Sequence, residues 1–123
     1  MTYVFLDANF CVVPFTKGVD IIAEIPVLVE NAHIAVPDFI LLELEKITKK
    51  ERFAKVALKY IESEGIEVLS TGMLPKDTDS ALLALAKEHN AIIATNDKAL
   101  RSRAKRRNIH TLFLRSGQTL EKA

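Results

Sequence analysis

The 123-residue sequence has a single cysteine, Cys11, so no disulfide can form within the chain. A chain without disulfides is typical of a reducing compartment. No apolar run approaches the ~18 residues that a membrane span requires, and the first residues lack the basic and long apolar segments of a signal peptide. We therefore expect a cytoplasmic protein that has no membrane partner.

Clusters of metal-binding or nucleophilic side chains are also scarce. The three histidines, His33, His89 and His110, are scattered, and no Cys/His spacing fits zinc. No Ser-His-Asp or Cys-His pattern for covalent catalysis is recognisable. The formal net charge is +1, which says little about partners, so the local distribution of charge must carry that argument.

The overall composition is that of an ordinary soluble domain, with 49% hydrophobic and 27% charged residues. The length suits one domain, which we expect to span residues 1–123, and allows a core that needs no metal or disulfide to fold. No repeat, low-complexity segment or linker interrupts the chain.

Short apolar runs alternate with segments of helical periodicity. Strands are predicted at residues 3–6, 33–36, 66–69, 91–95 and 109–114. Helices are predicted at residues 19–30, where Pro26 should kink the helix, and at 37–47, 52–64, 79–88 and 98–107. Residues 10–17 look irregular, and residues 116–123 look like a short polar tail. The alternation predicts an α/β fold with a mainly parallel, five-stranded sheet and right-handed crossovers.

Four acidic residues fall where such a fold brings side chains together. Asp7 follows the first strand and Asp97 the fourth, Glu43 lies about two turns into the helix after the second strand, and Asp79 begins the helix before the fourth. Because function in an open parallel sheet gathers beyond the carboxyl ends of the strands, we expect the four carboxylates to converge there. Converging carboxylates raise one another's pKa unless a cation compensates them. Mg²⁺ and Mn²⁺ prefer oxygen ligands, so the predicted cofactor is carboxylate-bound Mg²⁺ or Mn²⁺.

Each acid also has a simpler interpretation. Asp7 could merely end a strand, Asp79 and Asp97 could cap helices, and Glu43 could be a solvated helix residue. Only the joint placement of the four favours a metal site.

The ordered segments LDANF, VPDFILLELEKI and TDSALLALAKEHNAIIATNDKAL resemble the PIN-domain nucleases over essentially the whole chain. The resemblance implies a three-layer α/β/α sandwich with strand order 3-2-1-4-5. It also implies RNA hydrolysis at three or four acids around one or two divalent ions. The family acids are matched in order by Asp7, Glu43, Asp79 and Asp97.

Two further positions bear on the resemblance. Thr95 matches a small hydroxyl residue that the family places two positions before its last acid. Ala99 stands where some members carry a further acid, which weakens the case for a second tightly held ion.

The implied activity is that of a metal-dependent endoribonuclease, with the ion held by Asp7, Asp97 and either Glu43 or Asp79. In-line attack by water would leave a 3′-hydroxyl and a 5′-phosphate. Two kinds of family member fit the chain: a toxin, usually dimeric and blocked by an antitoxin, and a ribosomal-RNA-processing nuclease. The segment TNDKALRSRAKRRNIHTLFLRSG looks more like the second kind.

The predicted partner is RNA, and basic clusters bind its phosphates without reading sequence. The residues predicted to bind substrate are Asn9, Thr95, Lys98, Arg101, Arg103 and Arg106. The last four belong to one basic helix, for which a solvated face is the alternative interpretation.

Two rival classes deserve comparison. A non-catalytic RNA-binding module of the same fold would use the basic helix alone. A phospho-signalling receiver domain would need an acidic pair after the first strand, an Asp after the third and a Lys after the last. Here Ala8 follows Asp7, no Asp follows Leu69, and Arg115 ends the last strand.

Overall fold

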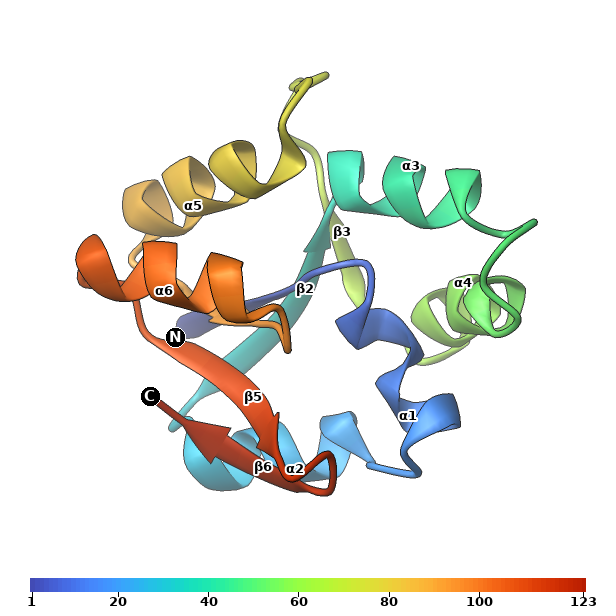
Figure 1. Cartoon of the computed structure of the whole chain (residues 1–123), viewed down its shortest axis with the longest axis horizontal. Helices are drawn as coiled ribbons and strands as arrows, with labels where there is room; N and C mark the ends of the chain where they lie inside the picture. Colours follow the sequence, from blue (N-terminus) through green and yellow to red (C-terminus); the bar gives the residue numbers. More distant parts are fainter.

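The computed structural model describes all 123 residues, with strands and helices alternating along the chain (Figure 1). The strands are β1 (Thr2–Leu6), β2 (Ala32–Pro37), β3 (Glu67–Leu69), β4 (Ile92–Ala94), β5 (Thr111–Arg115) and β6 (Thr119–Lys122). The helices are the 3-10 turn η1 (Phe10–Val12), α1 (Val13–Thr16), α2 (Ile21–Leu28), α3 (Asp38–Lys46), α4 (Ala54–Ser63), α5 (Thr78–His89) and α6 (Lys98–Arg106).

All six strands form one sheet in the order β3-β2-β1-β4-β5-β6. The first five are parallel, which confirms the predicted α/β fold and its order 3-2-1-4-5. β1 and β4 are neighbours, with Leu6 paired with Ala94. The chain order reverses between these two strands, and open α/β sheets place their ligand sites at such a point.

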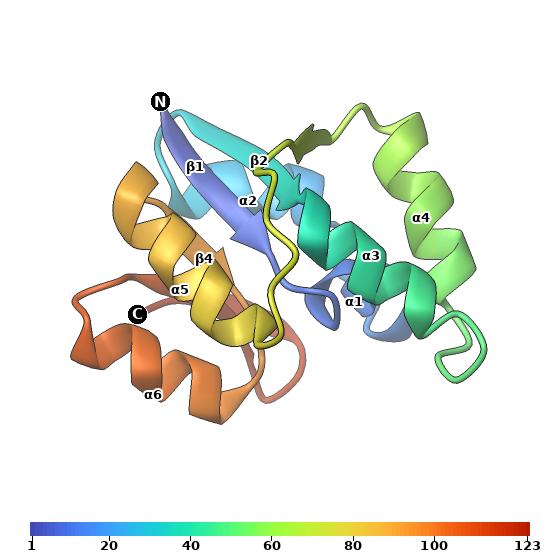
Figure 2. The same cartoon turned by 90° about the horizontal axis from the view of Figure 1, so that it is seen from above.

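Helices cover both faces of the sheet. α5 lies against β1 and β4, and α6 lies against β5, while α2 contacts β2 and β6 from the opposite face (Figures 1 and 2). α3 and α4 pack on each other, with α3 against β2 and β3. One apolar core of 36 buried residues joins these elements. None of the helices has the length and apolar character needed to cross a membrane.

Two segments that look irregular in the sequence have regular structure. Residues 10–16 form η1 and α1, with Pro14 in the first turn of α1, where a missing N–H is tolerated. Residues 119–122 form β6, antiparallel to β5. The connecting turn has Ser116 and Gly117 at φ of 55° and 69°, the left-handed region that tight hairpin turns require. The sheet therefore has six strands instead of the predicted five.

Candidate active site

The carboxyl edge of the sheet carries an acidic pocket of about 290 Å³, and the four predicted acids all line it. They come from four places in the chain: Asp7 follows β1, Glu43 lies in α3, Asp79 lies in the first turn of α5, and Asp97 precedes α6. Asn9 also lines the pocket. The parallel register of β1 and β4 brings the acids together because it ends both strands at the same edge.

Asp7 is the buried member of the group, with 7% of its surface exposed. One carboxylate oxygen accepts a hydrogen bond of 2.7 Å from the Phe10 N–H, and the other accepts one from the Thr95 hydroxyl. Burial raises the pKa of Asp7 to about 6, aided by the charges of Asp79 and Glu43 and opposed by the two hydrogen bonds. A nearby cation would favour the ionised form of this carboxyl.

Thr95 links two of the acids. Its side chain is fully buried, its hydroxyl donates to Asp7, and its oxygen accepts from the Asp97 N–H at 3.0 Å. The sequence placed Thr95 among the substrate-binding residues. In the structure it is fully buried, is not among the residues that line the pocket, and holds Asp7 and Asp97 in position through these two hydrogen bonds.

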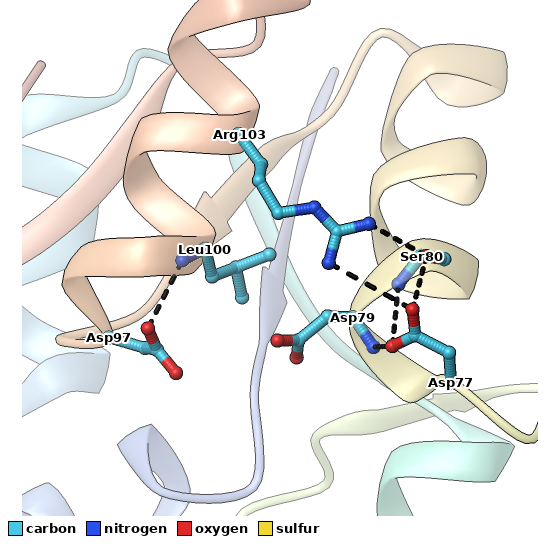
Figure 3. A network of polar contacts seen from close by, with 6 residues as sticks. All are labelled: Asp77, Asp79, Ser80, Asp97, Leu100 and Arg103. Atoms are coloured by element: carbon cyan, nitrogen blue, oxygen red, sulfur yellow. Dashed lines mark hydrogen bonds and ion pairs between the residues drawn. The ribbon is translucent and has the colours of Figure 1, made fainter.

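Asp97 caps α6, as its simpler interpretation suggested. Its Oδ1 accepts from the Ala99 N–H at 2.8 Å and from the Leu100 N–H at 3.1 Å, and Figure 3 shows the second of these bonds. Its side chain nevertheless lines the acidic pocket, so capping and pocket formation are combined in one residue.

The cap of α5 is Asp77, which accepts from the N–H groups of Asp79 and Ser80 at 3.1 and 3.3 Å. Asp79 therefore keeps its own carboxylate free, and Figure 3 shows it directed toward Asp97. Burial and the charges of Asp97 and Asp77 raise the pKa of Asp79, while Arg103 lowers it.

Arg103 joins α6 to the start of α5. Its guanidinium donates to the Ser80 hydroxyl at 2.7 Å and lies 3.9 Å from the Asp77 carboxylate (Figure 3). A positive charge thus lies between two helix starts that carry three acids, and it offsets part of their repulsion.

The other predicted basic residues do not share a surface with Arg103. Lys98 and Arg101 line a separate groove beside α6. Arg106 is exposed and lines neither this groove nor the acidic pocket.

Sequence reasoning gave no role in the site to Lys76 and Asp77, and none to Asp38 in holding the loop that leads to it. Lys76 and Asp77 line the pocket, and Asp77 was recognisable only as a helix cap. Asp38, at the start of α3, accepts from the Thr71 N–H at 3.0 Å and from its hydroxyl at 2.6 Å, which anchors the loop before α5. No sequence signal predicts this contact, because the two residues lie 33 positions apart.

The chemistry of the pocket fits a hard divalent cation. Its acidic donors are all carboxylate oxygens, and the pKa of both Asp7 and Asp79 is raised in part by neighbouring acids. No three acidic, histidine or cysteine side chains are arranged to hold one ion together. Mg²⁺ usually takes one or two carboxylates and keeps several waters, a number of ligands that the pocket supplies.

The fold and the pocket define a parallel α/β protein whose acids gather at the switch point of the sheet. A family model described as a PIN-like domain matches residues 4–117. The chain therefore belongs to the PIN-like domain family, which confirms the resemblance seen in the sequence.

Three solved structures share this fold. The PIN domain endonuclease Utp24 has a TM-score of 0.82 at 23% identity, with 98% of this chain and 90% of that chain covered. A domain of a functionally unknown Methanocaldococcus jannaschii protein has a TM-score of 0.64 at 24% identity, with 94% of this chain and 92% of that chain covered. Rickettsia felis VapBC2, bound to a promoter DNA fragment, has a TM-score of 0.66 at 20% identity, with 93% of this chain and 100% of that chain covered. Curated proteins gave no match.

Asp7→Asn tests the electrostatic cost of the buried acid. The folded pKa of about 6 exceeds the ~3.9 of an unfolded Asp, so the folded state binds this proton more tightly and stability falls as pH rises from 4 through 6. Ionisation of Asp7 therefore lowers the free energy of unfolding by about 1.5 kcal/mol at pH 5 and by about 3 kcal/mol at pH 8. In EDTA, we expect the stability of Asp7→Asn relative to the parent to increase by roughly 1–1.5 kcal/mol between these pH values. Urea unfolding at both values would show this, and a difference independent of pH would contradict it.

Arg103→Gln tests the link between α5 and α6. The change removes one hydrogen bond and a partly exposed ion pair, so we expect a loss of about 1 kcal/mol in the free energy of unfolding. Arg106→Gln, on the same helix, is the matched control and should change stability by less than about 0.5 kcal/mol. Urea unfolding of both variants measures the difference, and equal effects would show that the link contributes nothing.

Proposed function

We propose that the chain is a divalent-metal-dependent endoribonuclease that hydrolyses RNA phosphodiester bonds. The observation that carries this proposal is the convergence of Asp7, Glu43, Asp79 and Asp97 on one pocket. Membership of the PIN-like domain family supports it, and so does the description of a solved structure of the same fold as an endonuclease.

Asp7 is the anchored ligand in this proposal, because Thr95 and the Phe10 N–H fix both of its oxygens. Asp97 and either Glu43 or Asp79 would supply the other carboxylates, directly or through waters that Mg²⁺ keeps when it binds proteins. Mg²⁺ or Mn²⁺, when bound, lowers the pKa of a ligated water and offsets charge that develops on the phosphate.

The remaining chemistry needs no nucleophilic side chain. Asn9 is exposed at the pocket, and its amide can orient a water molecule by accepting or donating a hydrogen bond. Attack of the water oxygen on phosphorus forms one P–O bond and breaks the bond to the 3′ oxygen. The products are a 5′-phosphate and a 3′-hydroxyl.

The biological setting is also part of the proposal. The basic segment at residues 95–117 favours a ribosomal-RNA-processing nuclease over a toxin. A second copy of the chain, an antitoxin partner and a cytoplasmic location remain predictions from the sequence. Light scattering of the purified chain tests the homodimer, and a single-chain mass would contradict it.

Cleavage of RNA by a matched pair of variants tests the proposed activity. Glu43 and Glu45 lie on the same helix, but only Glu43 lines the pocket. With Mg²⁺ or Mn²⁺, we expect Glu43→Gln to lower the cleavage rate by about 100-fold or more and Glu45→Gln to leave it unchanged. Asp97→Asn should also be inactive although Asn can still cap α6.

The outcomes separate the candidate functions. Cleavage that persists in EDTA, or that is equally fast in all variants, would exclude the metal-dependent site. Tight RNA binding without any cleavage in either ion would favour the non-catalytic RNA-binding module.

A further inference from the structure

A second hollow, which we call the α6 groove, runs along the flank of α6. It has a volume of about 690 Å³. Its α6 wall consists of Lys98, Arg101, Ser102 and Lys105, and its far end is lined by His110 and Ala123. No acidic side chain lines it.

The spacing of the α6 residues explains this wall. Arg101, Ser102 and Lys105 follow Lys98 by three, four and seven residues, so the four side chains share one face of the helix. Arg103 lies on another face and contacts α5. The basic run is therefore divided between a structural link to α5 and the α6 groove.

The cations of the α6 groove form no ion pair with an acidic residue of the chain. The ion pairs of the structure join His33 to Glu67, Arg103 to Asp77, and Arg115 to Glu121. Lys98, Arg101 and Lys105 therefore keep their charge available for an anion from outside the chain.

Arg101 has a further distinctive feature. Its guanidinium lies 3.6 Å from the centroid of the Phe113 ring, and its Nε is buried without a hydrogen-bond partner. The ring of Phe113 supports the guanidinium from one side, which limits the orientations available to it. A supported guanidinium plane is a surface on which an unpaired base can stack.

The α6 groove begins beside the acidic pocket, because Lys98 directly follows Asp97. α6 has nine residues and is therefore about 13 Å long. A strand with one phosphate at the acids can thus place its next phosphates along α6. The groove volume lies within the range of about 300–1,000 Å³ typical of ligand pockets, enough for about one or two nucleotides.

We propose that the α6 groove binds a single-stranded segment of RNA adjacent to the phosphate that is cleaved. Lys98 and Lys105 contact backbone phosphates, and Arg101 stacks against an unpaired base. The identity of the substrate rests on the proposed function, whereas binding in the groove does not require cleavage.

Binding of a fluorescent oligouridylate of about 12 nucleotides, followed by anisotropy in EDTA, tests the groove without cleavage. Lys98→Gln with Lys105→Gln should weaken binding roughly tenfold or more at about 50 mM salt. The slope of log affinity against log salt should fall by about 1.4, since each lost contact with a single strand removes about 0.7. The control is Lys55→Gln with Lys59→Gln, two exposed cations on α4, and it should bind like the parent.

Arg101→Lys tests the stacking contribution, because it keeps the charge and removes the guanidinium plane. We expect its affinity to fall about threefold or more while the salt slope stays unchanged, since base stacking is worth about 1–3 kcal/mol and a lysine retains part of the contact. Thermal melting of each variant establishes that it is folded.

The following results would contradict the proposal. If Lys55→Gln with Lys59→Gln weakens RNA binding as much as the groove variant does, binding reflects general attraction to a charged protein. If a blunt RNA duplex competes as well as the single strand, stacking of an unpaired base is excluded. If inorganic phosphate displaces the fluorescent oligouridylate at the same concentration as unlabelled RNA does, the groove is a simple anion site that does not recognise RNA. If the Lys98/Lys105 variant binds RNA like the parent while Glu43-dependent cleavage is intact, only the groove proposal fails. If binding depends on the groove but the parent never cleaves RNA, only the proposed nuclease activity fails.

Discussion

The hydrogen bond from the Thr95 hydroxyl to the Asp7 carboxylate is the contact on which the candidate site depends. It joins residues 88 positions apart that follow two neighbouring strands of the sheet. The same hydroxyl accepts from the Asp97 N–H, so the start of α6 is tied to the end of β1. Because Thr95 and Asp7 are both buried, loss of this contact would leave polar groups unpartnered at about 1–3 kcal/mol each.

The site gathers negative charge at some expense of stability. Burial and neighbouring acids raise the pKa of Asp7 and Asp79, which means that ionisation of these carboxyls destabilises the folded protein. Two features limit this destabilisation. Asp77 and Asp97 cap the N-termini of α5 and α6, and the Arg103 guanidinium lies beside Asp77. Sites that trade stability for function commonly show this conflict, and a bound cation would relieve it.

The sequence predicted the parts of the molecule that follow from periodicity. Buried strands and helical spacing predicted the α/β fold and its parallel sheet, and the gathering of the acids at one edge followed from that topology. The strand order 3-2-1-4-5 came from the resemblance to the PIN-domain nucleases. It could not predict β6, because Leu120 is the only buried residue of that four-residue strand and gives no repeating pattern. Nor could it separate Arg103 from Lys98 and Arg101, because the neighbour of each face of α6 is set by tertiary packing.

The ionisation of Asp7 with and without a divalent ion tests the central claim most directly. The carboxyl resonance of Asp7 can be followed by NMR against pH, first in EDTA and then in Mg²⁺. We expect a midpoint near 6 in EDTA, and a much lower midpoint in Mg²⁺ because a cation favours the carboxylate. A midpoint that does not move when Mg²⁺ is added would contradict a metal site at Asp7.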